Sequence, residues 1–208
     1  MINMNIDDFK VPIIKKGVSS VSSLKKEFIN KKIILFGVPG AFTPTCSEKH
    51  LPGYIKLYNS FINKKIDGIY CLSVNDEHVM KSWLLSYTNG EIINGIADGN
   101  AEITKYFDLI SDKTKNYMGF RCRRFAMIIE NNAIIKKFIE NDGEYSVSSA
   151  EYILEQISIS VNKNTLKGDK SAISPSGIRI GLCAMTTRGL KTQDCIFIAL
   201  FIDRAIQI

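Results

Sequence analysis

The sequence predicts an α/β protein: one domain over residues 1–157, followed by a shorter appendage over residues 158–208. Apolar runs alternate with helical patterns in the first half, and two more apolar runs flank a short turn in the second half. With 208 residues, 45% hydrophobic and 23% charged, the chain supports one sizeable core and is too apolar for a disordered protein.

The first half reads as strand, helix, strand, helix. The apolar run at residues 33–38 is stopped by Pro39-Gly40, which predicts a buried strand. Thr43 is then an N-cap and Pro44 a first helical residue, and apolar residues recur at helical spacing at Leu51, Tyr54, Ile55, Tyr58 and Ile62. A second buried strand is expected at residues 69–74 and a second helix at 75–87.

The second half adds a hairpin and a closing helix. A short strand at residues 92–97 and a short helix at 101–107 come first. Two apolar runs then flank Asn131-Asn132, which predicts a two-residue turn with positive φ, and a helix capped by Ser148 should end near residue 157. This order of elements is typical of the thioredoxin-like fold.

Charge and composition exclude several classes of function. The net charge is +6, but no Lys/Arg run interleaved with aromatic residues is present, which argues against nucleic-acid binding. No apolar run reaches about 18 residues, and the first ten residues lack the pattern of a signal peptide, so we expect no membrane span. We expect a cytoplasmic protein, or an organellar one where an upstream targeting segment has been removed.

The cysteines favour a reducing compartment and one special thiol. They form no CxxC pair, and two histidines give no zinc spacing, so we expect no metal and no cofactor. Their positions are Cys46, Cys71, Cys122, Cys183 and Cys195.

Cys46 falls at the third position of the helix that Thr43 would cap. Unpaired backbone N–H groups and the helix dipole stabilise a thiolate there, and Thr43 stands where a dithiol oxidoreductase would carry its second cysteine. Position alone also fits a buried cysteine beside an ordinary capped helix.

A longer motif surrounds this cysteine. Residues 38–53, VPGAFTPTCSEKHLPG, closely resemble the active-site segment of peroxiredoxins, specifically the peroxiredoxin 5-like (type II) group. Residues 71–76 and 123–125 also resemble that family, in the same order, so the resemblance covers residues from about 30 to 157. It implies a thiol-dependent peroxidase that reduces hydrogen peroxide and organic hydroperoxides, and it allows a homodimer.

The resemblance also implies roles for four residues. Cys46 would be the peroxidatic cysteine, Thr43 would orient the peroxide, and Pro39 would shield the site from water. Arg124 would stabilise the thiolate and polarise the O–O bond, which suits a permanently charged guanidinium with several donors.

Other candidates receive lesser roles. His50 lies four residues after Cys46, so a Cys–His pair is conceivable, but we expect it near the pocket rim without a catalytic role. Arg121 and Arg123 are expected to be surface charges, and Cys71, inside an apolar strand, a core residue.

The chain departs from many relatives at residues 145–149, where a second cysteine would resolve the sulfenic acid and Ser148 stands instead. It therefore resembles a one-cysteine enzyme reduced by glutathione, glutaredoxin or thioredoxin. Cys122 is the alternative resolving partner. A peroxide-sensing or chaperone-like redox protein is the second function that Cys46 would allow.

The appendage has a different resemblance. Residues 158–208 resemble the C-terminal end of serine hydroxymethyltransferase, whose substrate-carboxylate arginine would correspond to Arg179, although Leu182-Cys183 departs from the usual Thr-Pro. A pyridoxal-phosphate enzyme needs a lysine and a large domain that this piece does not contain, so we expect it not to be autonomous.

Overall fold

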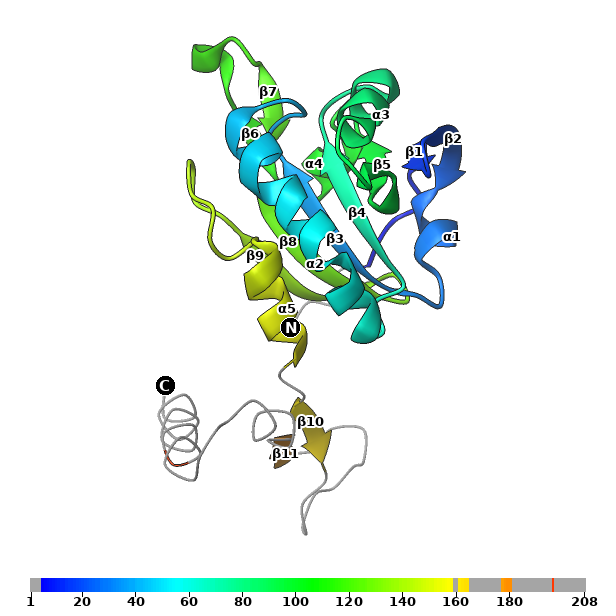
Figure 1. Ribbon diagram of the computed structural model, residues 1–208, viewed down its shortest axis with the longest axis vertical. Helices are drawn as coiled ribbons and strands as arrows, with labels where there is room; N and C mark the ends of the chain where they lie inside the picture. Colours follow the sequence, from blue (N-terminus) through cyan, green and yellow to red (C-terminus); the bar gives the residue numbers. More distant parts are fainter. Residues whose placement is uncertain (1–4, 159–160, 165–176, 181–195, 197–208) are drawn as a thin grey trace. The chain divides into compact units, whose positions relative to one another are not determined.

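The computed structural model describes residues 5–158, 161–164, 177–180 and 196. The chain divides into two units, Met1–Gln156 and Ile157–Ile208. In the first unit, a seven-stranded sheet has the strand order β2-β1-β5-β4-β3-β8-β9 (Figure 1).

The three central strands of the sheet run parallel to one another, and a hairpin beyond them joins the sheet by antiparallel pairing. β3 (Lys32–Val38) pairs in parallel with β4 (Gly68–Ser73), which pairs in parallel with β5 (Asn94–Ala97). On the other side of β3, the hairpin of β8 (Phe125–Glu130) and β9 (Ala133–Ile139) continues the sheet in antiparallel fashion. The thioredoxin-like fold predicted from the sequence is confirmed.

Helices follow the strands as the apolar spacing predicts. α2 (Leu51–Asn63) packs on β4, and Figure 1 shows it crossing the sheet over β3 and β4. α3 (Glu77–Leu85) packs on β1 and β5, and Asp76 caps it by accepting from two backbone N–H groups. α4 (Glu102–Tyr106) and the closing helix α5 (Ala150–Ser158) also lie where they were expected. The hydroxyl that caps α5 belongs to Ser149, which accepts from the Tyr152 N–H, and not to Ser148 as predicted.

The structure adds elements that the sequence did not reveal. β1 (Lys10–Lys15) and β2 (Val18–Ser23) form an edge hairpin, and the short helix α1 (Leu24–Phe28) follows it. β6 (Ile110–Asp112) and β7 (Phe120–Cys122) form a separate two-stranded ribbon. β2 is rich in serine and partly exposed, and β6 and β7 have three residues each, so they lack the apolar runs by which buried strands are recognised. β1 does contain buried apolar residues, but Pro12 interrupts them, and proline argues against a strand.

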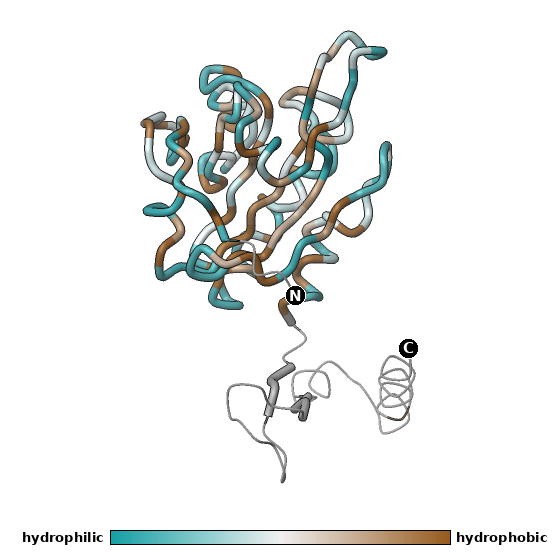
Figure 2. The backbone as a smooth tube through the Cα atoms, turned by 180° about the vertical axis from the view of Figure 1, so that it is seen from behind, coloured by the Kyte–Doolittle hydropathy of each residue, from teal (hydrophilic) through white to brown (hydrophobic). Residues whose placement is uncertain are grey.

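The core occupies both faces of the sheet because the central strands are buried on both sides. Ile33 and Leu35 belong to a cluster that includes residues of α1 and α4, whereas Phe36 faces α2 and stacks on Tyr54 with ring centroids 4.1 Å apart. Figure 2 shows apolar stretches in the interior strands and hydrophilic ones in the outer loops.

The turn between β8 and β9 has the predicted backbone conformation. Asn131 and Asn132 have φ values of 48° and 66°.

In the appendage, β10 (Val161–Asn164) pairs with β11 (Gly177–Ile180). Residues 182–183, where the sequence departs from serine hydroxymethyltransferase, lie outside the described residues. Within the part of the chain that the structure describes, no helix is long and apolar enough to cross a membrane.

Candidate active site

The site begins at the turn that carries Cys46. The chain is helical from Pro44, so Cys46 is the third helical residue, as predicted. From Cys46 to His50, however, the helix widens into a π-helical turn, in which the Leu51 N–H donates to the Cys46 carbonyl. The sequence predicted a regular α-helix here. π-Turns within α-helices occur frequently at functional sites.

Neighbouring elements hold this turn through Ser47. The Trp83 indole Nε1 donates to the Ser47 hydroxyl at 3.0 Å, and the Tyr87 hydroxyl donates to the Ser47 carbonyl at 2.9 Å. The Ser47 N–H donates to the Thr43 carbonyl at 2.9 Å. The residue next to Cys46 is thus tied to α3, to the turn after α3 and to the start of its own helix.

Cys46 and Arg124, 78 positions apart in the sequence, meet at this site. The Cys46 side chain is fully buried, and Nη2 of Arg124 donates to its Sγ at 3.6 Å. Arg124 directly precedes β8, which pairs with β3, and the Cys46 turn follows the end of β3. The permanently charged guanidinium therefore faces the sulfur.

His50 is a central member of the site, so the expectation that it lies at the pocket rim is wrong. It is fully buried, and its Nδ1 lies 3.0 Å from Nη1 of Arg124. Because arginine only donates, Nδ1 must be the acceptor. The ring proton then sits on Nε2, which donates to the Ser148 carbonyl at 3.0 Å.

The electrostatics agree with a neutral His50. Burial lowers its pKa to about 3, helped by the charge of Arg124 and opposed by the hydrogen bond to the Ser148 carbonyl. With both ring nitrogens engaged, His50 has no free lone pair to accept a proton from Cys46. It accepts from Arg124 instead, a contact that spacing along one helix could not reveal.

Thr43 and Pro39 flank the Cys46 turn. The Thr43 hydroxyl donates to the Gly40 carbonyl at 2.8 Å, and among the described residues no helical N–H donates to it, unlike in the predicted cap. Pro39 is half-buried and lines a cavity of about 140 Å³ that Thr45, Arg124 and other residues also line. The structure therefore brings Pro39 and Arg124 to one cavity and places Thr43 one turn before Cys46.

Two other arginines differ from expectation. Arg121 and Arg123 were predicted to be surface charges, but both are half-buried and donate to backbone carbonyls, so that prediction is wrong. Arg121 donates to Met118 at 2.7 Å and to Val74 at 3.0 Å, and Arg123 donates to the carbonyl that follows β9. Their stems lie against the protein while their donors fasten loops around the site.

The remaining described cysteines are buried and free. Cys71 lies inside β4, as expected for a core residue, and burial raises its pKa, with further upward contributions from Cys46 and Cys122. Burial also raises the pKa of Cys122 to about 12. Both therefore remain thiols at neutral pH and are poor nucleophiles.

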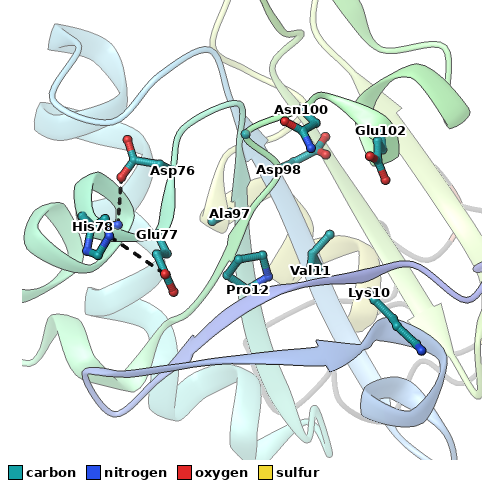
Figure 3. A pocket seen from close by; sticks show the side chains of 11 residues that line it. Lys10, Val11, Pro12, Asp76, Glu77, His78, Ala97, Asp98, Asn100 and Glu102 are labelled. Carbon is teal, nitrogen blue, oxygen red and sulfur yellow. Dashed lines mark hydrogen bonds and ion pairs between the residues drawn. The ribbon is translucent and has the colours of Figure 1, made fainter.

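A larger cavity, of about 310 Å³, contains none of the predicted site residues (Figure 3). Its carboxylates serve the fold: Asp76 caps α3, and Asp98 accepts from Thr104 and from the backbone N–H of Ile103 in α4. His78, also in its lining, is exposed. We assign this larger cavity no role in the chemistry at Cys46.

Comparison with known proteins shows the family. A model of the Redoxin family matches residues 2–154. Peroxiredoxin-2D of Arabidopsis thaliana is 46% identical over 127 residues, which cover 61% of this chain and 78% of that protein. The chain belongs to the peroxiredoxin family. Peroxisomal membrane associated protein 20 of Schizosaccharomyces pombe is also similar, at 42% identity over 61% of this chain and 82% of its own.

Solved peroxiredoxin structures share the fold. Reduced Prx3 of Vibrio vulnificus in complex with H₂O₂ superposes with a TM-score of 0.70 at 39% identity, over 74% of this chain and 97% of that one. The Plasmodium falciparum antioxidant protein, a 1-Cys peroxiredoxin, gives a TM-score of 0.69 at 36% identity, over 75% and 97%.

Membership of the peroxiredoxin family shows the class of activity. This peroxiredoxin is a thiol-dependent peroxidase, an oxidoreductase, as the motif around Cys46 predicted. The Redoxin match starts at residue 2, so it includes the N-terminal hairpin that the resemblance did not cover. It ends at residue 154 and lends no support to the predicted resemblance of residues 158–208 to serine hydroxymethyltransferase.

Proposed function

We propose that the enzyme reduces hydrogen peroxide and organic hydroperoxides through Cys46. The thiolate attacks the terminal oxygen, an S–O bond forms and the O–O bond breaks. The sulfur is oxidised to sulfenic acid while the peroxide is reduced to water or an alcohol, whose oxygen takes up a proton. The observation that carries this proposal is the 3.6 Å contact between Nη2 of Arg124 and Sγ of Cys46.

The neighbouring groups suit this step. Arg124 has donors left to polarise the O–O bond because His50 engages Nη1 only. Thr43, whose hydroxyl now donates to Gly40, would orient the peroxide, and Pro39 would keep water from the sulfur. The Vibrio vulnificus protein, solved with H₂O₂ bound, supports the same substrate class here.

We further propose that the enzyme is of the one-cysteine type. Ser148 occupies the position predicted for a resolving cysteine, and the two other described cysteines of the first unit are buried thiols. An external thiol, from glutathione with glutaredoxin or from thioredoxin, would attack the sulfenic sulfur and release water. A second thiol would then reduce the mixed disulfide and restore Cys46.

One assay tests this function. Peroxide consumption is followed with glutathione and glutaredoxin, and in parallel with thioredoxin, for the full chain and for Cys46→Ser. We expect turnover with at least one system and none in the variant, because an alcohol neither ionises near neutral pH nor forms a sulfenic acid. Turnover retained by Cys46→Ser would contradict the assignment.

We also propose a homodimer in a reducing compartment such as the cytoplasm. Phe42, beside the Cys46 turn, and Phe120 in β7 are 58% and 60% exposed, and exposed aromatic residues are enriched at protein interfaces. Sedimentation of the full chain and of Phe120→Ser measures the association, and a monomeric full chain would contradict the dimer.

The reducing compartment is proposed because free cysteines are typical of such compartments.

A further inference from the structure

We propose that Glu140 is a positioning residue for the peroxide-reducing step, acting through Ser148 and His50 on Arg124. This inference rests on the proposed function of Cys46. Glu140 touches neither the sulfur nor the arginine side chain. It organises the segment that holds them.

The carboxylate of Glu140 is buried and collects hydrogen bonds from one short segment. Glu140 follows β9 and is 2% exposed. Its Oε1 accepts from the Ser146 N–H at 2.6 Å, the Ser148 N–H at 2.8 Å and the Ser148 hydroxyl at 2.8 Å. Among the described residues, no lysine or arginine forms an ion pair with it. These donors replace the water that burial removes.

The carboxylate is therefore ionised and fixed. Burial acts to raise the pKa of Glu140, but the hydrogen bonds from Ser146 and Ser148 favour the charged form, and its pKa lies below the usual value. At neutral pH, Glu140 is a constant acceptor that holds Ser146 and Ser148 in one arrangement.

The segment held by Glu140 carries one group that contacts His50 and another that contacts both His50 and Arg124. The Ser148 carbonyl accepts from Nε2 of His50 at 3.0 Å and from the Tyr54 hydroxyl at 2.9 Å. The Tyr145 ring lies under the guanidinium, with Cζ of Arg124 5.8 Å from its centroid, and it also meets the His50 ring edge-on at 5.2 Å.

These contacts form one continuous path to the sulfur. Glu140 fixes Ser148, Ser148 orients His50 and sets its tautomer, and His50 accepts from Nη1 of Arg124. The other nitrogen, Nη2, then points at Cys46. Glu140 also secures the backbone of Arg124, because its N–H donates to the Arg124 carbonyl at 3.0 Å.

The consequence is a specific kinetic signature. When Glu140 is removed, Ser148 loses its anchor, and the arginine no longer keeps the geometry that attack on a peroxide requires. Misplacement of a catalytic group by about 1 Å can cost about a hundredfold in rate. Alkylation of Cys46 by iodoacetamide requires no oriented O–O bond, so it should depend far less on Glu140.

The experiment uses the full chain and three variants at position 140. Stopped-flow fluorescence of Trp83, the single tryptophan, gives the rate constant for reaction with H₂O₂. We expect Glu140→Ala to lower it at least about tenfold while iodoacetamide alkylation changes less than about threefold. Glu140→Gln keeps an acceptor oxygen at the same reach and should recover most of the rate. Glu140→Asp keeps the charge but is shorter, and should resemble the alanine variant.

A matched control and a double-mutant cycle make the test selective. Glu155→Ala removes an exposed carboxylate of α5 that does not line the cavity shared by Pro39 and Arg124, and should leave the rate unchanged. In an Arg124→Ala background, Glu140→Ala should cost less than about twofold, because the group through which it acts is already gone.

Three outcomes would overturn the proposal. They are a wild-type rate in both Glu140→Ala and Glu140→Asp, an equal loss in the Arg124→Ala background, or an equal fall in alkylation and peroxide rates. Should the alanine variant not fold, Glu140→Asp and Glu140→Gln decide the matter alone. Failure of the proposed function would look different, because the unmutated chain would then show no Cys46-dependent reaction with peroxide.

Discussion

Replacement of Arg124 by alanine should slow the reaction of Cys46 with peroxide. At the observed 3.6 Å between Nη2 and Sγ, a full charge pair is worth about 1 kcal/mol in water and about 5 kcal/mol at an effective dielectric constant of about 20. Hydrogen bonds to charged groups contribute about 1.5–3 kcal/mol. Since Arg124 is half-buried, we take about 2 kcal/mol, or about a thirtyfold effect.

Arg124→Lys separates charge from geometry. Lysine keeps the positive charge but offers one nitrogen, so it cannot donate to His50 and to Cys46 with the fixed spacing of a guanidinium. We expect the lysine variant also to react slowly with peroxide, because the charge alone does not restore the geometry of the guanidinium.

The assay is stopped-flow mixing of the full chain and of Arg124→Ala with H₂O₂ at one pH. The rate constant of the variant should be about thirtyfold lower. An unchanged rate constant would refute the reasoning, since the guanidinium would then do nothing at the sulfur.

Four further predictions concern the oxidation product of Cys46, the residues Thr43 and His50, and the appendage. Mass spectrometry of the peroxide-treated protein should find Cys46 as a sulfenic acid or a glutathione mixed disulfide, and a Cys46–Cys122 disulfide would contradict this. Thr43→Val should slow peroxide reduction and lower the free energy of unfolding by about 1 kcal/mol through loss of the bond to Gly40, whereas Thr43→Ser should restore both. Because the pKa of His50 is about 3 in the folded state and 6.5 is its ordinary value, only the unfolded chain binds this proton between those values. The resulting stability is present above pH 6.5 and is lost as pH falls toward 3, with a slope of about 1.4 kcal/mol per pH unit, and denaturant titrations should show a shallower slope for His50→Leu. Ending the chain after residue 157 should leave peroxide turnover close to that of the full protein, and a large loss would make residues 158–208 a functional element.

The sequence sufficed for those parts of the molecule that local rules determine. Buried strands such as β3 and β4 are continuous apolar runs, the helix after β3 begins at Pro44, and the turn at residues 131–132 uses residues that tolerate positive φ. Cys46 was recognisable because its chemistry depends on its place at a helix start and on the motif around it. Arg124 followed from the family motif before Phe125, and its role awaits the experiments above.

Only the tertiary structure showed what surrounds these residues. Within the π-turn at Cys46–His50, Ser47 accepts hydrogen bonds from Trp83 in α3 and from Tyr87 in the turn that follows α3. Such a widening leaves no mark in apolar spacing.

The same holds for the groups that hold Arg124. Whether a histidine is charged or neutral depends on the groups that meet its two ring nitrogens. For His50, these groups belong to Arg124 and Ser148, which lie 74 and 98 positions away in the sequence. Glu140 would pass for a solvated carboxylate in the sequence, yet folding buries it against Ser146 and Ser148. Hydrogen-bond partners of buried polar groups are chosen by packing across the whole chain, and packing has no local sequence signal.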